Sequence, residues 1–201
     1  MIKKIILISV LSLMVQLITA CVDCKCGPYR TILFTNKGLS IKNLDSNLPQ
    51  PAVTSAGIIP SAKYGIQVQH LTEEVALRKP QIYWGLIQSA YACSCPGDYL
   101  KSKEEIVSVK IISNNDFDTN HPKGSELSSI FMVKRYYNDD LSSINDYLKT
   151  LKLEYQSNYP FQKGIFLQVA PTIAKKHKFK IAITLTDGRI LEAETTEVEL
   201  T

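Results

Sequence analysis

Five cysteines are the residues of this chain whose spacing most directly suggests chemistry. Four of them form two pairs in which one residue separates the thiols, Cys24 with Cys26 and Cys93 with Cys95. On an extended strand, residues two apart point to the same face, so each pair would present two sulfur atoms side by side. We therefore predict that Cys24 and Cys26 are cross-linked to Cys93 and Cys95, in either pairing. The alternative is a four-thiolate metal site, although paired zinc-binding cysteines usually have two or more residues between them.

The fifth cysteine follows a segment typical of an export signal. Lys3 and Lys4 precede an apolar stretch from Ile5 to Ala20. As a helix this stretch would measure about 24 Å, which is less than the roughly 30 Å hydrocarbon core of a bilayer. The pattern favours a cleaved signal peptide over a buried N-terminal helix or an uncleaved anchor. Export would also place the other four cysteines in an oxidising compartment, which favours disulfides over free thiols.

The end of this segment, Ile18 to Cys21, resembles the lipobox of bacterial lipoproteins, in which an apolar, a variable and a small residue precede the cysteine. The resemblance implies that the Cys21 thiol takes a diacylglyceryl group, with acyl chains such as palmitate, and that acylated Cys21 becomes the N-terminus. Several acyl chains hold a protein firmly on a membrane, since each buried methylene contributes about 0.8 kcal/mol. The predicted organisation is a lipoprotein signal peptide at 1–20, a lipidated tether at 21–28 and a single domain at 29–201.

The charge of the chain argues against a nucleic-acid partner. The formal net charge is only +4, and the lysines are scattered rather than arranged in a stripe. No second long apolar segment follows the signal, so we expect a soluble body held to the membrane by its lipid. The length fits one domain with a core of its own.

The three histidines, His70, His121 and His177, lie in no catalytic motif. His177 stands among lysines, whose charge would favour the neutral imidazole, and we expect this segment to be the solvated start of a strand. The sequence contains no G-x-S-x-G elbow, no H-E-x-x-H and no glycine-rich phosphate loop. It therefore predicts no catalytic residue and no cofactor. The alternative is an active site whose serine, histidine and acid come from distant positions.

One polar segment partly matches a calcium-binding loop. Asp116, Asp118 and Asn120 place oxygen ligands at every second residue, as in the first half of such a loop. His121 then occupies the position that needs glycine, and Glu126 falls one residue short of the bidentate ligand. The favoured interpretation is a polar loop in which Asp and Asn side chains form turns, with calcium as the alternative.

Short alternating segments separated by turn residues dominate the rest of the chain. The clearest pattern is a C-terminal hairpin, in which a strand at 179–185 and a strand at 189–195 flank Asp187-Gly188, a dipeptide that suits a two-residue turn. Val198 and Leu200 extend its apolar pattern. A second clear strand covers 64–69. The other predicted strands are 31–35, 39–44, 87–95, 106–112 and 165–170.

Two segments have helical patterns. Thr72 followed by two glutamates predicts a short helix that ends before Pro80. Asp140 begins a longer pattern, with Leu141, Ile144, Leu148 and Leu151 at helical spacing. The predicted fold class is mainly β, an immunoglobulin-like β-sandwich with one or two short helical insertions.

Several short motifs together resemble an uncharacterised family of Bacteroidota lipoproteins, a domain of unknown function. Besides the lipobox, they are the segments 94–98, 111–113, 116–117 and 124–127, Phe131, and the Asp187-Gly188 turn. The resemblance covers most of the chain after the signal. It implies a location in the cell envelope, outside the cytoplasm, with the outer membrane or the cell surface favoured. It brings no catalytic residues with it.

The sequence thus predicts a membrane-anchored lipoprotein that acts as a non-catalytic binding or structural module of the envelope. Its expected partners are the membrane, through the lipid, and an envelope protein or glycan. The alternative is an envelope hydrolase with dispersed catalytic residues. A deep pocket with converging acids or histidines would support the hydrolase.

Overall fold

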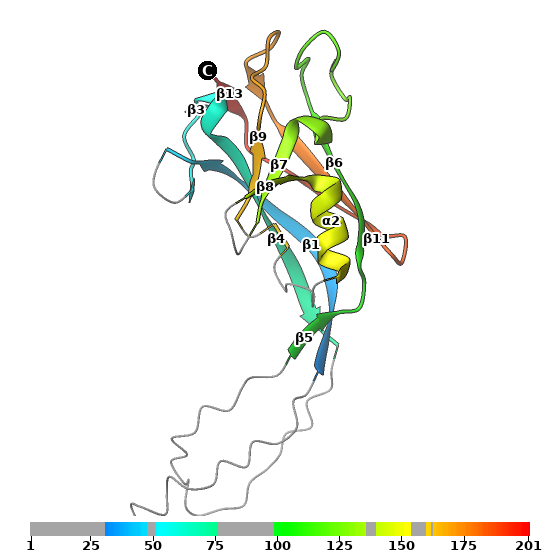
Figure 1. Ribbon diagram of the computed structural model, residues 1–201. Coiled ribbons are helices and arrows are strands. Elements are labelled where there is room, and N and C mark those ends of the chain that lie inside the picture. The colour runs from blue at the N-terminus through cyan, green and yellow to red at the C-terminus, as the bar shows by residue number, and fades with distance from the viewer. Residues whose placement is uncertain (1–30, 48–50, 76–98, 136–139, 154–159, 162) are drawn as a thin grey trace, which may run out of the picture. The chain divides into compact units, whose positions relative to one another are not determined.

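A computed structural model describes residues 31–47, 51–75, 99–135, 140–153, 160–161 and 163–201 (Figure 1). The chain divides into two compact units, one formed by Met1–Ile32 with Ala76–Tyr99 and the other by Leu33–Val75 with Leu100–Thr201. Nearly all described residues belong to the second unit, and the following account is of that unit. Within the described part of the chain, no helix has the length and hydropathy required to cross a membrane.

The largest sheet has seven strands and is built around one long hairpin. Strand β1 (Thr31–Asp45) pairs antiparallel with β4 (Tyr64–Glu74) along most of its length. The order across the sheet is β2-β1-β4-β9-β7-β8, and β5 also pairs with β1. The remaining bounds are β2 (Ala52–Val53), β5 (Tyr99–Ser102), β7 (Phe131–Lys134), β8 (Leu141–Ser143) and β9 (Ile165–Leu167).

Two three-stranded sheets complete the β structure. One has the order β12-β11-β6 and is antiparallel, with β6 (Ile106–Ser113), β11 (Phe179–Leu185) and β12 (Ile190–Glu194). The other joins β10 (Lys176–His177), β13 (Val198–Leu200) and β3 (Ile58–Ile59), and its β13–β3 pair is parallel. Two 3-10 turns, η1 (Ser61–Lys63) and η2 (Ser128–Ile130), connect strands. The helix α2 (Ile144–Leu153) follows β8.

Aromatic side chains join the seven-stranded sheet to the β12-β11-β6 sheet. The Phe179 ring of β11 lies with its centroid 5.3 Å from that of Tyr64 on β4 and 5.6 Å from that of Phe131 on β7. All three side chains are buried. Aromatic pairs at this separation add attraction to the burial itself. One hydrophobic core therefore serves both sheets, and the fold is mainly β with several antiparallel sheets.

The predicted C-terminal hairpin is confirmed. Strands β11 and β12 pair through Asp187-Gly188, and Gly188 has a φ of 85°, a conformation that glycine adopts without strain. The side chains of β11 alternate between buried and partly exposed, with Phe179, Ile181, Ile183 and Leu185 in the core. Val198 and Leu200 are buried as well.

The helix predicted from Thr72 is wrong for the residues that the structure describes. Thr72, Glu73 and Glu74 are the last residues of β4 and pair with Phe34–Asn36 of β1. The threonine and the two acids would suit the first turn of a helix, but their backbone is instead hydrogen-bonded to β1 as part of the strand ladder. Tertiary pairing here outweighs a weak local preference.

The other predicted elements are mostly present with shifted ends. Predicted strands 31–35 and 39–44 form one strand, β1, with an irregularity between Asn36 and Gly38. The helix begins at Ile144 rather than Asp140, because Leu141 lies in β8 and is exposed. Strand β6 extends one residue beyond its prediction, β9 is shorter than predicted, and the strand predicted at 87–95 lies outside the described residues.

Candidate functional site

Ser113 and His177 form the one serine–histidine pair that the described residues bring together. Their contact joins the end of β6 to β10 across 64 residues of sequence, with the Ser113 Oγ 2.8 Å from the His177 Nδ1. The His177 Nε2 lies 2.8 Å from the Ala174 carbonyl oxygen, which can only accept, so Nε2 carries the proton. Nδ1 of the neutral ring therefore accepts from the Ser113 hydroxyl. Ser113 Oγ accepts in turn from the Asn115 N–H, at 3.1 Å.

This pair lies inside the core rather than at a surface. His177 is 0 % exposed and Ser113 is 3 % exposed. The imidazole lies 5.4 Å from the Phe117 ring and 5.5 Å from the Phe179 ring. In a catalytic triad a carboxylate holds Nδ1 and the free Nε2 faces the serine, whereas here Nδ1 faces the serine and a backbone carbonyl holds Nε2. The geometry is that of a buried structural link.

The solvated environment expected for His177 is therefore wrong. Burial is the main cause that lowers its pKa, although the hydrogen bond to Ala174 acts in the opposite direction. The neighbouring lysines are exposed, and His177 continues the inward positions of β11 two residues before Phe179. This period of two was present in the sequence and would have placed the ring in the core.

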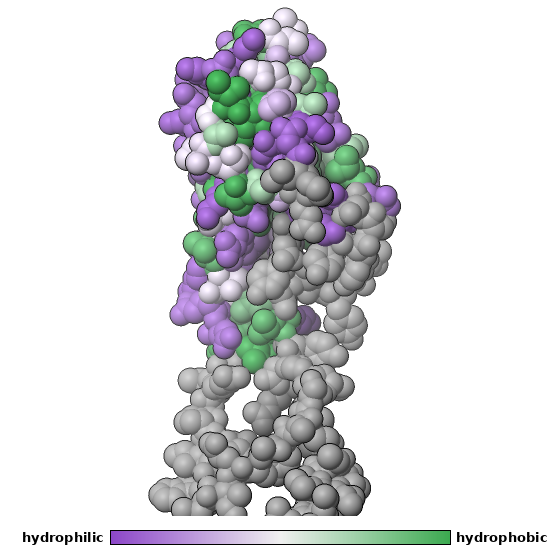
Figure 2. All heavy atoms as spheres, turned by 90° about the vertical axis from the view of Figure 1, so that its left-hand side faces the viewer, coloured by the Kyte–Doolittle hydropathy of each residue, from purple (hydrophilic) through white to green (hydrophobic). Residues whose placement is uncertain are grey.

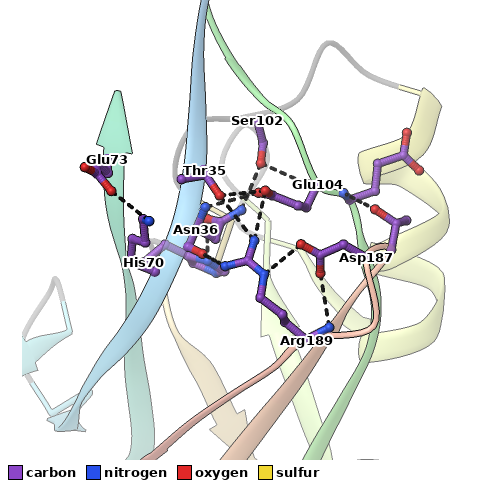
Figure 3. A network of polar contacts seen from close by, with 11 residues as sticks. Thr35, Asn36, His70, Glu73, Ser102, Glu104, Asp187 and Arg189 are labelled. Atoms are coloured by element: carbon purple, nitrogen blue, oxygen red, sulfur yellow. Dashed lines mark hydrogen bonds and ion pairs between the residues drawn. The ribbon is translucent and has the colours of Figure 1, made fainter. Parts of the chain in front are cut away.

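A second cluster of polar side chains gathers around Glu104, between β5 and β6 (Figure 3). Glu104 as a whole residue is 8 % exposed. Its Oε1 accepts from the Thr35 hydroxyl at 2.6 Å, and its Oε2 accepts from the Asn36 N–H at 3.1 Å. The Arg189 guanidinium, from the residue just before β12, lies 2.9 Å from Oε1. We call Glu104, Arg189, Thr35 and Asn36 the clasp.

Arg189 connects three parts of the chain through the clasp. Its Nε donates to Asp187 at 2.7 Å, its Nη1 donates to the Asn36 carbonyl at 2.7 Å, and its Nη2 donates to the Thr35 hydroxyl at 3.2 Å. Burial alone would raise the pKa of Glu104. The hydrogen bonds from Thr35 and Asn36, together with the charge of Arg189, hold this pKa below its usual value instead. Glu104 is thus a carboxylate kept ionised, with its oxygens already occupied.

His70 extends the cluster into the core. The His70 Nδ1 lies 3.2 Å from the Asn36 Oδ1, and the Asn36 Nδ2 donates to the Ser102 hydroxyl at 2.8 Å. Because the amide oxygen only accepts, Nδ1 carries the proton of the neutral ring. Burial lowers the pKa of His70 to about 4. Its Nε2 is buried and has no hydrogen-bond partner among the described residues.

A further polar link joins β1 to the segment after β12. The Asn43 Nδ2 donates to the carbonyl and hydroxyl oxygens of Thr196, at 3.2 and 3.0 Å. The Tyr64 hydroxyl donates to the Asn43 Oδ1 at 2.8 Å. Together with the clasp, this link attaches β1 to the β12 region at two points, near Asn36 and at Asn43. No backbone ladder between β1 and β12 is present in the described residues.

The aspartates of the candidate calcium loop accept hydrogen bonds from within the loop itself. The Asp118 Oδ1 accepts from the N–H groups of Asn120 and His121, both at 2.8 Å, and lies 2.9 Å from the His121 Nδ1. The Asp116 Oδ1 accepts from the Lys123 N–H at 2.7 Å. The hydrogen bond from His121 lowers the pKa of Asp118 despite some burial. These contacts favour the polar loop over calcium, and no three His, Cys, Asp or Glu side chains of the described chain form a metal-binding group.

The predicted cysteine sites, Cys21, Cys24, Cys26, Cys93 and Cys95, lie outside the described residues. Lipidation, disulfide pairing and the four-thiolate alternative therefore stay predictions. Sequence reasoning missed the clasp completely. Glu104 sits in a charged run, Lys101 to Glu105, that has the composition of a solvated loop, and no local signal connects it to Arg189.

Comparison with known families decides what the chain is related to. Residues 36–196 match a family described as a domain of unknown function, DUF5034. The chain belongs to the DUF5034 family. This finding confirms the predicted membership of an uncharacterised family.

The DUF5034 match covers most of the structural features described above. It begins at Asn36 of the clasp and ends at Thr196 of the second polar link. The buried Ser113–His177 pair also lies within it. A search of curated proteins and a search of solved structures each gave no match.

Proposed function

We propose that the chain is a lipoprotein of the cell envelope that acts as a non-catalytic binding or structural module. In this proposal Cys21 carries the lipid, residues 21–28 form the tether, and the domain that follows faces away from the cytoplasm, on the outer membrane or the cell surface. We propose an immunoglobulin-like sandwich for the arrangement of its sheets, and the Bacteroidota lipoproteins as its source family. Disulfides between the pairs Cys24/Cys26 and Cys93/Cys95 would join the tether to the region around 93–95.

The proposal that the module is non-catalytic rests on how the reactive side chains are placed. The Ser113–His177 pair lies in the core and the Glu104 carboxylate is occupied by the clasp. A nucleophile needs access to substrate, and a general acid or base needs a free site on its reacting atom. Neither condition holds for these groups, which favours the binding module over the hydrolase.

A rigid loop with exposed apolar side chains supports a binding role. Val169 and Ile173, in the loop after β9, are 48 % and 55 % exposed. Three backbone hydrogen bonds hold this loop, from the Thr172 and Ile173 N–H groups to the Phe117 carbonyl and from the Ala174 N–H to the Asp116 carbonyl. Binding residues are often found on loops that a rigid scaffold positions.

The surface of the described residues fits the same role. On the face in Figure 2, hydrophobic atoms form small groups among hydrophilic ones. Apolar side chains exposed in small groups are normal on a protein surface and do not make a continuous membrane-binding patch. The partner proposed for the loops is an envelope protein or a glycan.

The lipid anchor is tested by substituting Cys21. We expect Cys21→Ser to abolish acylation, because serine lacks the thiol that takes the diacylglyceryl group, and to leave an unprocessed precursor or a released form. Intact mass and membrane fractionation of the full chain measure both effects. Cys24→Ser is the matched control and should leave acylation unchanged. An acylated, membrane-bound Cys21→Ser protein of mature size would contradict the proposal.

The non-catalytic part is tested with a fluorophosphonate probe, which labels activated serines. We expect no labelling of the full chain, since Ser113 is buried and its hydroxyl donates a hydrogen bond to His177 inside the core. A known serine hydrolase in the same reaction serves as the positive control. Labelling that disappears in Ser113→Ala would overturn the non-catalytic assignment and favour the hydrolase.

A further inference from the structure

One end of the β1–β4 hairpin has little hydrophobic core beneath it. On β4, the inward side chains Tyr64, Ile66 and Val68 are buried, and His70 is the last buried residue of that face. Thr72 and Glu74 continue the same face but are exposed. Of the described apolar side chains at this end, which carries Leu33–Asn36 and Thr72–Val75, only Phe34 is buried, and it lies outside the main core cluster. Hydrophobic burial therefore stabilises this end less than the rest of the sheet.

The pairing of β1 with β4 is also irregular where this end joins the rest of the hairpin. The register between β1 and β4 shifts between Asn36 and Gly38. Such an irregularity leaves a residue without its partner and bends the strand locally. Pairing continues beyond the shift, from Asn36 to Phe34, so the first part of β1 is connected to the regular ladder through this irregularity.

The clasp contacts β1 at Thr35 and Asn36, directly beside this irregularity (Figure 3). Glu104 accepts from Thr35 and from the Asn36 N–H, while Arg189 donates to the Asn36 carbonyl. Both charged residues come from outside the hairpin, one between β5 and β6 and the other just before β12. Charge-assisted hydrogen bonds are stronger than neutral ones, so these contacts add stability to β1 at this position.

We propose that the clasp is a latch that holds the segment Leu33–Asn36 of β1, together with Thr72–Val75 and β5, onto an otherwise independent core. When the latch is released, this end opens as a local unit while β6, β11 and β12 stay folded. Local units of low stability typically have few buried apolar contacts, as this end does. In the anchored protein of the proposed function, on which this one consequence rests, β1 is the first described strand after the tether. Opening would therefore add residues to the tether.

Hydrogen exchange of the full chain tests the latch. The variant Glu104→Gln keeps the shape of the side chain but removes its charge. We expect amides in 33–36, 72–75 and 100–104 to exchange at least about ten-fold faster, as loss of a charge-assisted hydrogen bond implies. The Asn36 amide, which donates to Glu104, is the direct reporter. Amides of β11 should exchange at the rate of the unmodified protein.

The matched control is Glu73→Gln, which removes an exposed ion pair with Lys37 at the same end of the hairpin. This control should leave exchange unchanged. Arg189→Lys is a second variant, which retains the charge but loses the planar group that reaches Asn36 and Thr35, and it should give a smaller local increase. Equal acceleration in β11, or no acceleration at Asn36, would overturn the latch.

The readout is independent of the proposed function. Exchange rates of 33–36 report the latch whether or not Cys21 carries a lipid, and the intact mass of the same sample reports lipidation. A chain without lipid that still shows the local increase would overturn the anchor and retain the latch. A lipidated chain without the local increase would overturn the latch and retain the anchor.

Discussion

Replacing Ile183 by aspartate is expected to unfold the domain. Ile183 lies in the middle of β11 with its side chain completely buried, between Val109 of β6 and Leu191 of β12 in the ladder. The substitution removes about 1.5–3 kcal/mol of apolar burial. It also places a carboxyl group in the core, which costs several kcal/mol more. The sum is comparable to the whole stability of a typical domain, about 5–15 kcal/mol.

Far-UV circular dichroism and urea unfolding of the variant measure this effect. Thr184→Asp is the matched control, because Thr184 is the next residue on the same strand and is partly exposed on the opposite face. We expect the control to change the free energy of unfolding by less than about 1 kcal/mol. If Ile183→Asp unfolded at the same urea concentration as the control, the assigned core face of β11 would be wrong.

His70 is expected to make the domain less stable in mild acid. Its pKa is about 4 in the folded chain because of burial, compared with about 6.5 in an unfolded chain. Above pH 6.5 both states are neutral at this residue, and it adds no pH dependence. Between pH 6.5 and 4 the unfolded state binds a proton that the folded state does not, so the free energy of unfolding falls as the pH falls. Between pH 7 and pH 5 the loss from His70 is about 2 kcal/mol.

The test compares urea unfolding of the full chain and of His70→Gln at pH 7, 6 and 5. The free energy of unfolding of the variant should fall by about 2 kcal/mol less across this range, whatever its stability at pH 7. His177 is buried in the same way and should leave a remaining slope of the same sign. The chosen range avoids the region below pH 4.5, where protonation of Glu104 and Asp118 adds its own loss. If the free energy of unfolding fell by the same amount between pH 7 and pH 5 in both proteins, the fold would not be keeping His70 neutral.

The strands of this domain were largely predictable because their signals are local. A period of two in apolar residues, as at Phe179, Ile181 and Ile183, places alternate side chains on one face whatever the sheet they join. Asp187-Gly188 supplies the positive φ of the hairpin turn on its own. The mainly β class followed from these patterns and is confirmed, as is membership of a family of unknown function.

The errors arose where pairing over long distances decided the outcome. Thr72–Glu74 has the composition of a helix start, but β1 lies beside it and extends the ladder. His177 was interpreted from its charged neighbours, although its position in the inward register of β11 determines its burial. In both cases the local signal was weaker than the contact that the fold provides.

The sequence by itself determined the β class, the C-terminal hairpin and the family, and it predicts the signal, the lipid at Cys21 and the paired cysteines. Only the tertiary structure decided which polar residues meet. Glu104 with Arg189 and Ser113 with His177 are each brought together across more than sixty residues, through strands whose order no local pattern encodes. The physical reason is that a charged or polar side chain carries no period that identifies its partner. Its pairing, burial and pKa depend on which strands the hydrophobic core brings together.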